Sequence, residues 1–100
     1  MFKVRLTEEA RDDLLRLYDF LLDSDLDAAE RALETIGDAL RLLTKFPFSC
    51  RKAAKGLHGS FLRELIIPFG SAGYVALFEI DDARTVTVLA VRHQREQDYH

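Results

Sequence analysis

Apolar and polar residues alternate at the start of the chain, and the period changes further along. Residues 2–6 read FKVRL, so apolar and basic side chains fall on opposite faces of an extended segment. This pattern predicts a half-buried strand.

A helical period follows over residues 8–22. Thr7 is the expected N-cap, and Glu8 and Glu9 lie in the first turn, where the helix dipole favours negative charge. An apolar stripe predicts burial of one helix face and consists of Ala10, Leu14, Leu17, Tyr18 and Leu21.

A second helix is predicted over residues 26–45, with Ser24 or Asp25 as its N-cap and Pro47 just beyond its end. The short connection makes the two helices antiparallel neighbours. Gly37 inside this helix indicates a close helix contact. The apolar stripe consists of Ala29, Leu33, Ile36, Leu40 and Leu43.

The remainder of the chain has the period of strands. A loop is expected over residues 46–60, and strands are expected over 61–67, 72–80 and 84–91 at hairpin spacing. Alternation in the last strand predicts one face with Val86, Val88 and Ala90 and another with Thr85, Thr87, Leu89 and Val91.

The element order is therefore strand, helix, helix, strand, strand, strand, in a single domain over residues 1–100. It predicts an α+β fold (β-α-α-β-β-β) in which an antiparallel helical hairpin packs on one face of a small, mainly antiparallel sheet. Because both faces of the last strand are partly apolar, the second face is a candidate docking surface.

The composition mainly excludes classes of protein. With 48% hydrophobic and 31% charged residues, the chain has the composition of an ordinary globular protein. No apolar run approaches the ~20 residues that span a bilayer, and the N-terminus lacks a signal-peptide pattern, so we expect a cytoplasmic protein with no membrane partner. The single cysteine, Cys50, has no nucleophile motif around it.

The formal net charge of -3 is unevenly distributed. Acids are in excess over residues 1–44 and bases over residues 45–100, and the stretch from Lys45 to Arg63 contains bases but no acid. A chain that is acidic overall lacks the electrostatic signature of a strong nucleic-acid binder, so we expect no sequence-specific DNA binding by the chain alone.

Four segments, in this order, resemble the RelE/ParE superfamily of toxins from type II toxin-antitoxin modules, which act in plasmid stabilisation. LTEEARDDLLRLYDFL is similar to the opening helix of the family with its Ala-x-x-Asp-Leu core, and DAAERALETIGDALRLLTKFP is similar to the second helix. LRELIIPFGSAGYVALFEI resembles the strand pair of the family, and VTVLAVRHQREQDY its final strand and basic exit. The resemblance implies a toxin that halts growth when its cognate antitoxin, encoded next to it, is lost.

The superfamily has two kinds of target. ParE-like members poison DNA gyrase, whereas RelE-like members cut messenger RNA on the ribosome. Cleavage of RNA by its own 2′-hydroxyl needs a proton acceptor, a proton donor and cations around the phosphorane. The candidate catalytic residues are His93, Tyr99, Arg63 and Arg92. A structural role competes for two of them: Arg63 as an anchor for a helix or loop carboxylate, and His93 as a hydrogen-bonding residue at a strand end.

Two observations favour the ParE-like alternative. Gly70 precedes Ser-x-Gly-Tyr where RelE-like nucleases present an arginine to the scissile phosphate, and the chain is acidic. We therefore expect an inhibitor of DNA gyrase, with a ribosome-dependent endoribonuclease and a module that has lost its toxicity as alternatives. The expected target-contacting residues are Arg92, His93, Arg95 and Tyr99.

The antitoxin is expected to lay an amphipathic or extended segment over the apolar sheet face and the helical hairpin. No cofactor or metal is expected, since the histidines have no neighbouring ligand pattern. The predicted antitoxin-contacting residues are Leu14, Leu17, Leu65, Ile67, Val75, Leu77, Leu89 and Val91.

Overall fold

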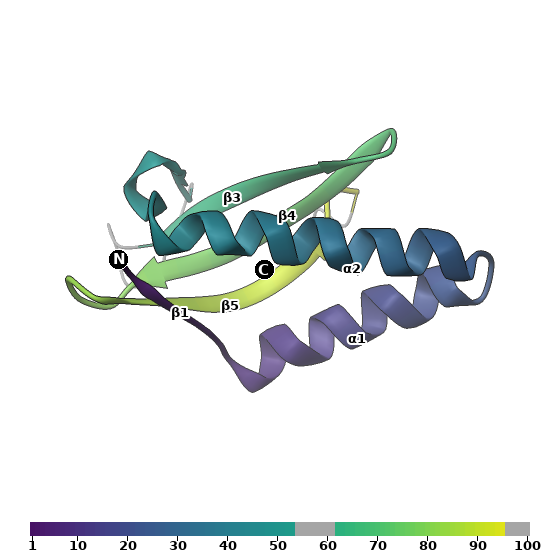
Figure 1. Cartoon of the computed structure of the whole chain (residues 1–100), viewed down its shortest axis with the longest axis horizontal. Helices are drawn as coiled ribbons and strands as arrows, with labels where there is room; N and C mark the ends of the chain where they lie inside the picture. Colours follow the sequence, from purple (N-terminus) through teal and green to yellow (C-terminus); the bar gives the residue numbers. More distant parts are fainter. Residues whose placement is uncertain (54–61, 96–100) are drawn as a thin grey trace.

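The computed structural model describes residues 1–53 and 62–95. A helical hairpin covers one face of a 5-stranded sheet with the strand order β1-β5-β4-β3-β2 (Figure 1). Paired strands are antiparallel except for β1 and β5, which are parallel. The α+β class and the mainly antiparallel sheet are confirmed. The strands are Lys3–Leu6 (β1), Arg51–Lys52 (β2), Leu62–Phe69 (β3), Ala72–Ile80 (β4) and Thr85–His93 (β5).

Both helices begin at predicted caps. In α1 (Glu8–Leu22) the hydroxyl of Thr7 accepts the N–H of Ala10 at 3.1 Å. In α2 (Leu26–Arg41) the carboxylate of Asp25, rather than the hydroxyl of Ser24, accepts the N–H of Ala28 at 3.2 Å. Each cap satisfies a backbone donor that the first helical turn leaves without a partner inside the helix. None of the described helices is long and apolar enough to cross a membrane.

The second helix is shorter than predicted. It tightens after Arg41 into the 3-10 turn η1 (Leu42–Thr44), and a second 3-10 turn, η2 (Pro47–Ser49), lies in the segment predicted to be a loop. Pro47 disfavours helical backbone at the residue before it, and Phe46 accordingly has φ -128° and ψ 43°. The strand β2 (Arg51–Lys52) also lies in this segment, so the prediction of a loop is wrong there, and the segment from residue 54 onward lies outside the described residues.

The core forms between the helical hairpin and the sheet, with two departures from what was predicted for α2. Leu33 is 39% exposed, and Ala32 is the buried residue at this level of α2. A Cβ added to Gly37 would meet nothing within 4 Å, so the predicted close helix contact at this glycine is wrong. The buried core consists mainly of Ala10, Leu17, Ala32, Ile36, Leu40, Leu43, Ile67, Tyr74, Ala76, Phe78, Val86, Val88 and Val91.

A β-bulge in β5 changes which side chains face the core. The pairing with β4 shifts between Leu77 and Phe78, and Leu89 is the additional residue on β5. One extra residue reverses the alternation of side chains beyond it. The predicted faces of Ala90 and Val91 are therefore wrong, because Val91 is fully buried with Val86 and Val88.

Candidate functional site

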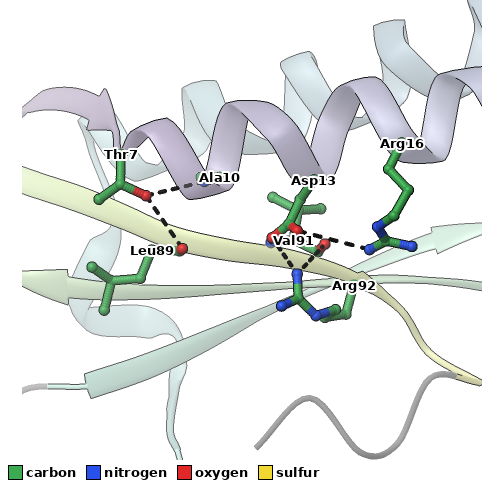
Figure 2. Close-up of polar contacts among 7 residues, drawn as sticks. All are labelled: Thr7, Ala10, Asp13, Arg16, Leu89, Val91 and Arg92. Atoms are coloured by element: carbon green, nitrogen blue, oxygen red, sulfur yellow. Dashed lines mark hydrogen bonds and ion pairs between the residues drawn. The ribbon is translucent and has the colours of Figure 1, made fainter.

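Side chains of α1 complete the edge of β5 where β1 stops (Figure 2). β1 ends at Leu6, and the hydroxyl of Thr7 then donates to the carbonyl of Leu89 at 3.3 Å. Further along, Asp13 Oδ2 accepts the N–H of Val91 at 2.9 Å. The helix therefore supplies hydrogen bonds that a longer β1 would otherwise have made, which satisfies backbone groups at the edge of the sheet.

Asp13 joins this edge to two arginines. Its side chain is 12% exposed and forms an ion pair with Arg92, while Arg16 Nη2 lies 3.8 Å from its other oxygen. Figure 2 shows the Asp13 carboxylate pointing from α1 toward β5, between these two guanidinium groups. Asp13 is the acid of the Ala-x-x-Asp-Leu core, and Ala10 of the same motif is fully buried. The motif thus places a small residue and a strand-capping acid on one helix face.

A groove of about 790 Å³ opens next to this network, between α1 and the β3–β4 hairpin. Its apolar lining includes Leu17, Leu21, Phe69 and Tyr74, and its basic lining consists of Arg16, His93 and Arg95. Phe20, which also lines the groove, is 76% exposed. Among the described residues that line it, none is acidic. The groove therefore combines apolar surface with positive charge.

His93 is the last residue of β5, and its ring is held by contacts in this groove. Its ring lies edge-on to the ring of Tyr74, with centroids 5.5 Å apart. The backbone N–H of Arg95 donates to His93 Nδ1 at 3.1 Å, so the proton of the neutral imidazole is on Nε2. Burial raises the pKa of Tyr74, which keeps its phenol neutral beside the imidazole. His93 therefore has a defined tautomer and orientation.

The three candidate catalytic residues that the structure describes do not meet in one place. Arg63 pairs with Phe78 of β4 and His93 pairs with Tyr74, which are about 13 Å apart along that strand. Arg92 is adjacent to His93 but is bound to Asp13, and Tyr99 lies outside the described residues. Arg63 and His93 therefore lie at different positions along the sheet.

Arg63 anchors the turn η2 instead. Its Nη1 donates to the carbonyl of Cys50 at 2.8 Å, and its guanidinium lies 5.4 Å from the centre of the Phe48 ring. These contacts give Arg63 a structural role, with carbonyls rather than a carboxylate as partners. Burial raises the pKa of the Cys50 thiol and outweighs the opposing attraction of Arg63, so the surroundings of Cys50 do not favour the reactive thiolate.

The predicted antitoxin-contacting residues lie on different surfaces. Leu17, Ile67 and Val91 are in the core, and Leu14 and Leu65 are partly buried against it. The pairing of Ile67 with Tyr74 and of Ile66 with Val75 places Val75, and with it Leu77, on the face away from the helices. Leu89 is at the bulge.

The groove includes residues that sequence patterns indicated and residues that they missed. His93 and Arg95 were expected to contact a partner, whereas Phe20 and Arg16 were not singled out and Asp13, although part of the Ala-x-x-Asp-Leu motif, was assigned no role. A signal for Asp13 was present, since an acid three residues after Ala10 and four before Leu17 lies on the apolar side of the helix. A carboxylate in that position requires a buried partner.

Comparisons with known proteins agree with this architecture. Residues 4–98 match the family described as the ParE toxin of the type II toxin-antitoxin system parDE. Toxin RelE3 of Caulobacter vibrioides is 32% identical over 98 residues, which cover 97% of this chain and 99% of that protein. A solved structure of the chromosomal ParDE system from P. aeruginosa has a TM-score of 0.75 at 18% identity, covering 93% of this chain and 96% of that one.

The fold and these matches define a type II toxin of the RelE/ParE superfamily. Within that superfamily, the chain belongs to the ParE toxin family. The sequence resemblance to RelE/ParE toxins is thereby confirmed.

Proposed function

We propose that this toxin acts by inhibiting DNA gyrase, with the groove between α1 and the β3–β4 hairpin as its target-contacting surface. The observation that carries the proposal is the distribution of cations. The hairpin tip that borders the groove consists of Gly70, with φ 60°, and Ser71, so it presents no guanidinium. Cleavage of a phosphodiester requires cations aimed at the charge that develops on the phosphorane.

The other arginines offer little positive charge that could stabilise the phosphorane. Arg92 is neutralised by Asp13, and Arg63 lies at the opposite end of β4. Arg16 and Arg95 line the groove, but Arg16 also lies beside the Asp13 carboxylate. An apolar groove with a modest positive charge is better suited to a protein surface than to a phosphodiester backbone.

The proposed target contacts are Arg92, His93, Arg95 and Tyr99. Arg95 is exposed beyond the end of β5, and His93 lies in the groove itself. The binding of Arg92 to Asp13 leaves 25% of the Arg92 side chain exposed, so its contribution to target contact is the smallest of the described three. As in other toxin-antitoxin pairs, a cognate protein antitoxin would neutralise the toxin.

A ribosome-dependent endoribonuclease is the second candidate, because His93 lines the groove in a fixed orientation. An imidazole can transfer protons near neutral pH. Tyr99 would be its partner in proton transfer, as the sequence resemblance implies. The name of the Caulobacter relative, Toxin RelE3, is compatible with this candidate.

Gyrase supercoiling assays with purified toxin test the proposal. The wild-type toxin should inhibit supercoiling, Arg95→Glu should weaken inhibition at least tenfold, and Arg11→Glu, an exposed arginine on the first turn of α1, should leave it unchanged. Full supercoiling activity at a large excess of toxin would exclude gyrase as the target. Cleavage of message in a translating extract, lost in His93→Ala, would establish the nuclease instead.

A further inference from the structure

We infer that Asp13 is a specificity-determining residue, which restricts the toxin to a protein target because its charge keeps Arg16 and Arg92 from binding nucleic acid. The inference rests on the proposed function, since it names the residue that makes a groove with basic lining unsuited to a phosphodiester backbone. Asp13 acts through the two arginines and is therefore a positioning residue rather than a contact of the target.

The groove between α1 and the β3–β4 hairpin has features that binding sites for single-stranded nucleic acid share. Such sites combine cations along the backbone with aromatic rings on which bases stack. Phe20 is 76% exposed in the lining of the groove, and Arg16, His93 and Arg95 also line it. The aromatic surface alone does not exclude nucleic acid, so the exclusion depends on how much positive charge the arginines offer.

The Asp13 carboxylate reduces this charge from a position next to the groove. It forms an ion pair with Arg92 through Oδ2, and its Oδ1 lies 3.8 Å from Nη2 of Arg16 (Figure 2). Arg92 directly precedes His93, which lines the groove, and Arg16 lines the groove itself. The two guanidinium groups therefore share one negative charge at the rim, and Asp13→Asn would remove it.

A backbone hydrogen bond holds the carboxylate in this position. Asp13 Oδ2 also accepts the N–H of Val91 at 2.9 Å, and the Asp13 side chain is 12% exposed. A partly buried pair is screened by salt much less than a pair between exposed side chains.

An exposed ion pair on α2 provides a matched control. The side chains of Arg41 and Asp38 form this pair and are 72% and 63% exposed. Asp38→Asn removes the same charge from the chain as Asp13→Asn, and it also removes the carboxylate of an ion-paired arginine. The two variants therefore differ in where the arginine lies and not in net charge.

The test is the affinity of the purified toxin for a short single-stranded oligouridylate, measured by fluorescence anisotropy over a series of salt concentrations. The wild type should bind weakly. Asp13→Asn should raise the affinity at low salt about threefold or more and should steepen the plot of log K against log salt by about 0.7–1.4, because each phosphate contact on a single strand contributes about 0.7. Asp38→Asn should stay within about 1.5-fold of wild type, because its arginine is already solvated.

Two further variants separate the charge of Asp13 from its structural role. Addition of Arg92→Met to Asp13→Asn should remove about 0.7 of the added slope, and further addition of Arg16→Met should remove the rest. A role confined to the edge of β5 would lower the stability of Asp13→Asn and leave the slope unchanged. Thermal melts of each variant verify that it is folded at the temperature of the assay.

Three results would overturn the inference. They are an affinity and slope in Asp13→Asn equal to those of the wild type, a rise in Asp38→Asn as large as that in Asp13→Asn, and a steepened slope that persists without both arginines. Failure of the wild-type toxin to inhibit gyrase would instead overturn the proposed target, because the oligonucleotide assay contains no gyrase and measures Asp13 independently.

Discussion

Replacement of Asp13 tests whether α1 completes the edge of β5. Asp13→Ala leaves the N–H of Val91 without its acceptor, which costs about 1–3 kcal/mol for a buried donor. It also removes the partner of Arg92, whose side chain is 25% exposed. Breaking a fully buried pair costs about 3–5 kcal/mol, so the partly exposed pair adds less. We expect a total loss of about 3 kcal/mol in the free energy of unfolding.

Urea unfolding followed by circular dichroism measures this loss. For a domain of 100 residues, this loss corresponds to a fall in Tm of about 12–24 °C. Asp13→Asn retains an oxygen that can accept the Val91 N–H but loses the charge, so it should cost less, about 1–2 kcal/mol. Asp12→Ala is the matched control, because Asp12 is exposed on the same helical turn and should change stability by less than about 0.5 kcal/mol.

A loss below about 1 kcal/mol in Asp13→Ala, or one equal to that of Asp12→Ala, would refute the role of Asp13 as an edge cap. An Asp13→Asn variant as unstable as Asp13→Ala would show that the charge, and therefore Arg92, dominates. A double-mutant cycle of Asp13→Asn with Arg92→Met measures that coupling directly.

Four smaller predictions concern single positions. Gly73→Ala should cost about 2–4 kcal/mol in a denaturant titration, because the residue has φ +137° and a Cβ would lie 2.3 Å from the carbonyl oxygen of Ile67. Gly37→Ala should instead stabilise the protein by about 0.5–1 kcal/mol, because the added methyl group meets nothing within 4 Å in the interior of α2. The pKa of Asp82 is lowered by the N–H of Arg84, so its stabilising contribution is present above the unfolded pKa of about 3.9 and is lost as pH falls through the folded value. The stability difference between wild type and Asp82→Asn should therefore shrink below about pH 4, as acid titration of unfolding will show. Because the pKa of Cys50 is raised, iodoacetamide should alkylate it more slowly in the folded protein than in urea at neutral pH.

Local patterns determined most of the secondary structure. The cap at Thr7 and the start of α1 were predicted to the residue, because a cap uses bonds within one turn. The strands β3, β4 and β5 were also located, β4 to the residue and the other two with ends that differ by one or two residues, since alternation is strongest where one face is buried. The resemblance to RelE/ParE toxins followed from the order of these same segments.

Such local patterns predicted only part of the candidate site. His93 and Arg95 stood out because the apolar strand ends there. Phe20, which is 76% exposed, was not part of the predicted apolar stripe of α1, and only the position of the β3–β4 hairpin makes it part of a groove. Arg63 and Arg92 looked like members of one cationic cluster, although their different partners separate them.

The tertiary structure determined features that the helix and strand periods of the sequence do not specify. The bulge at Leu89 reverses the faces of Ala90 and Val91, and it is defined by the register of β5 against β4 rather than by any residue of β5 alone. The role of Asp13 depends on its hydrogen bond with the N–H of Val91, which lies 78 residues away in sequence. The sequence by itself determined which elements form, because helix and strand periods act over a few neighbouring residues. Only the packed structure determined which polar groups of different elements bind one another. It therefore determined where the groove lies and what charge it has.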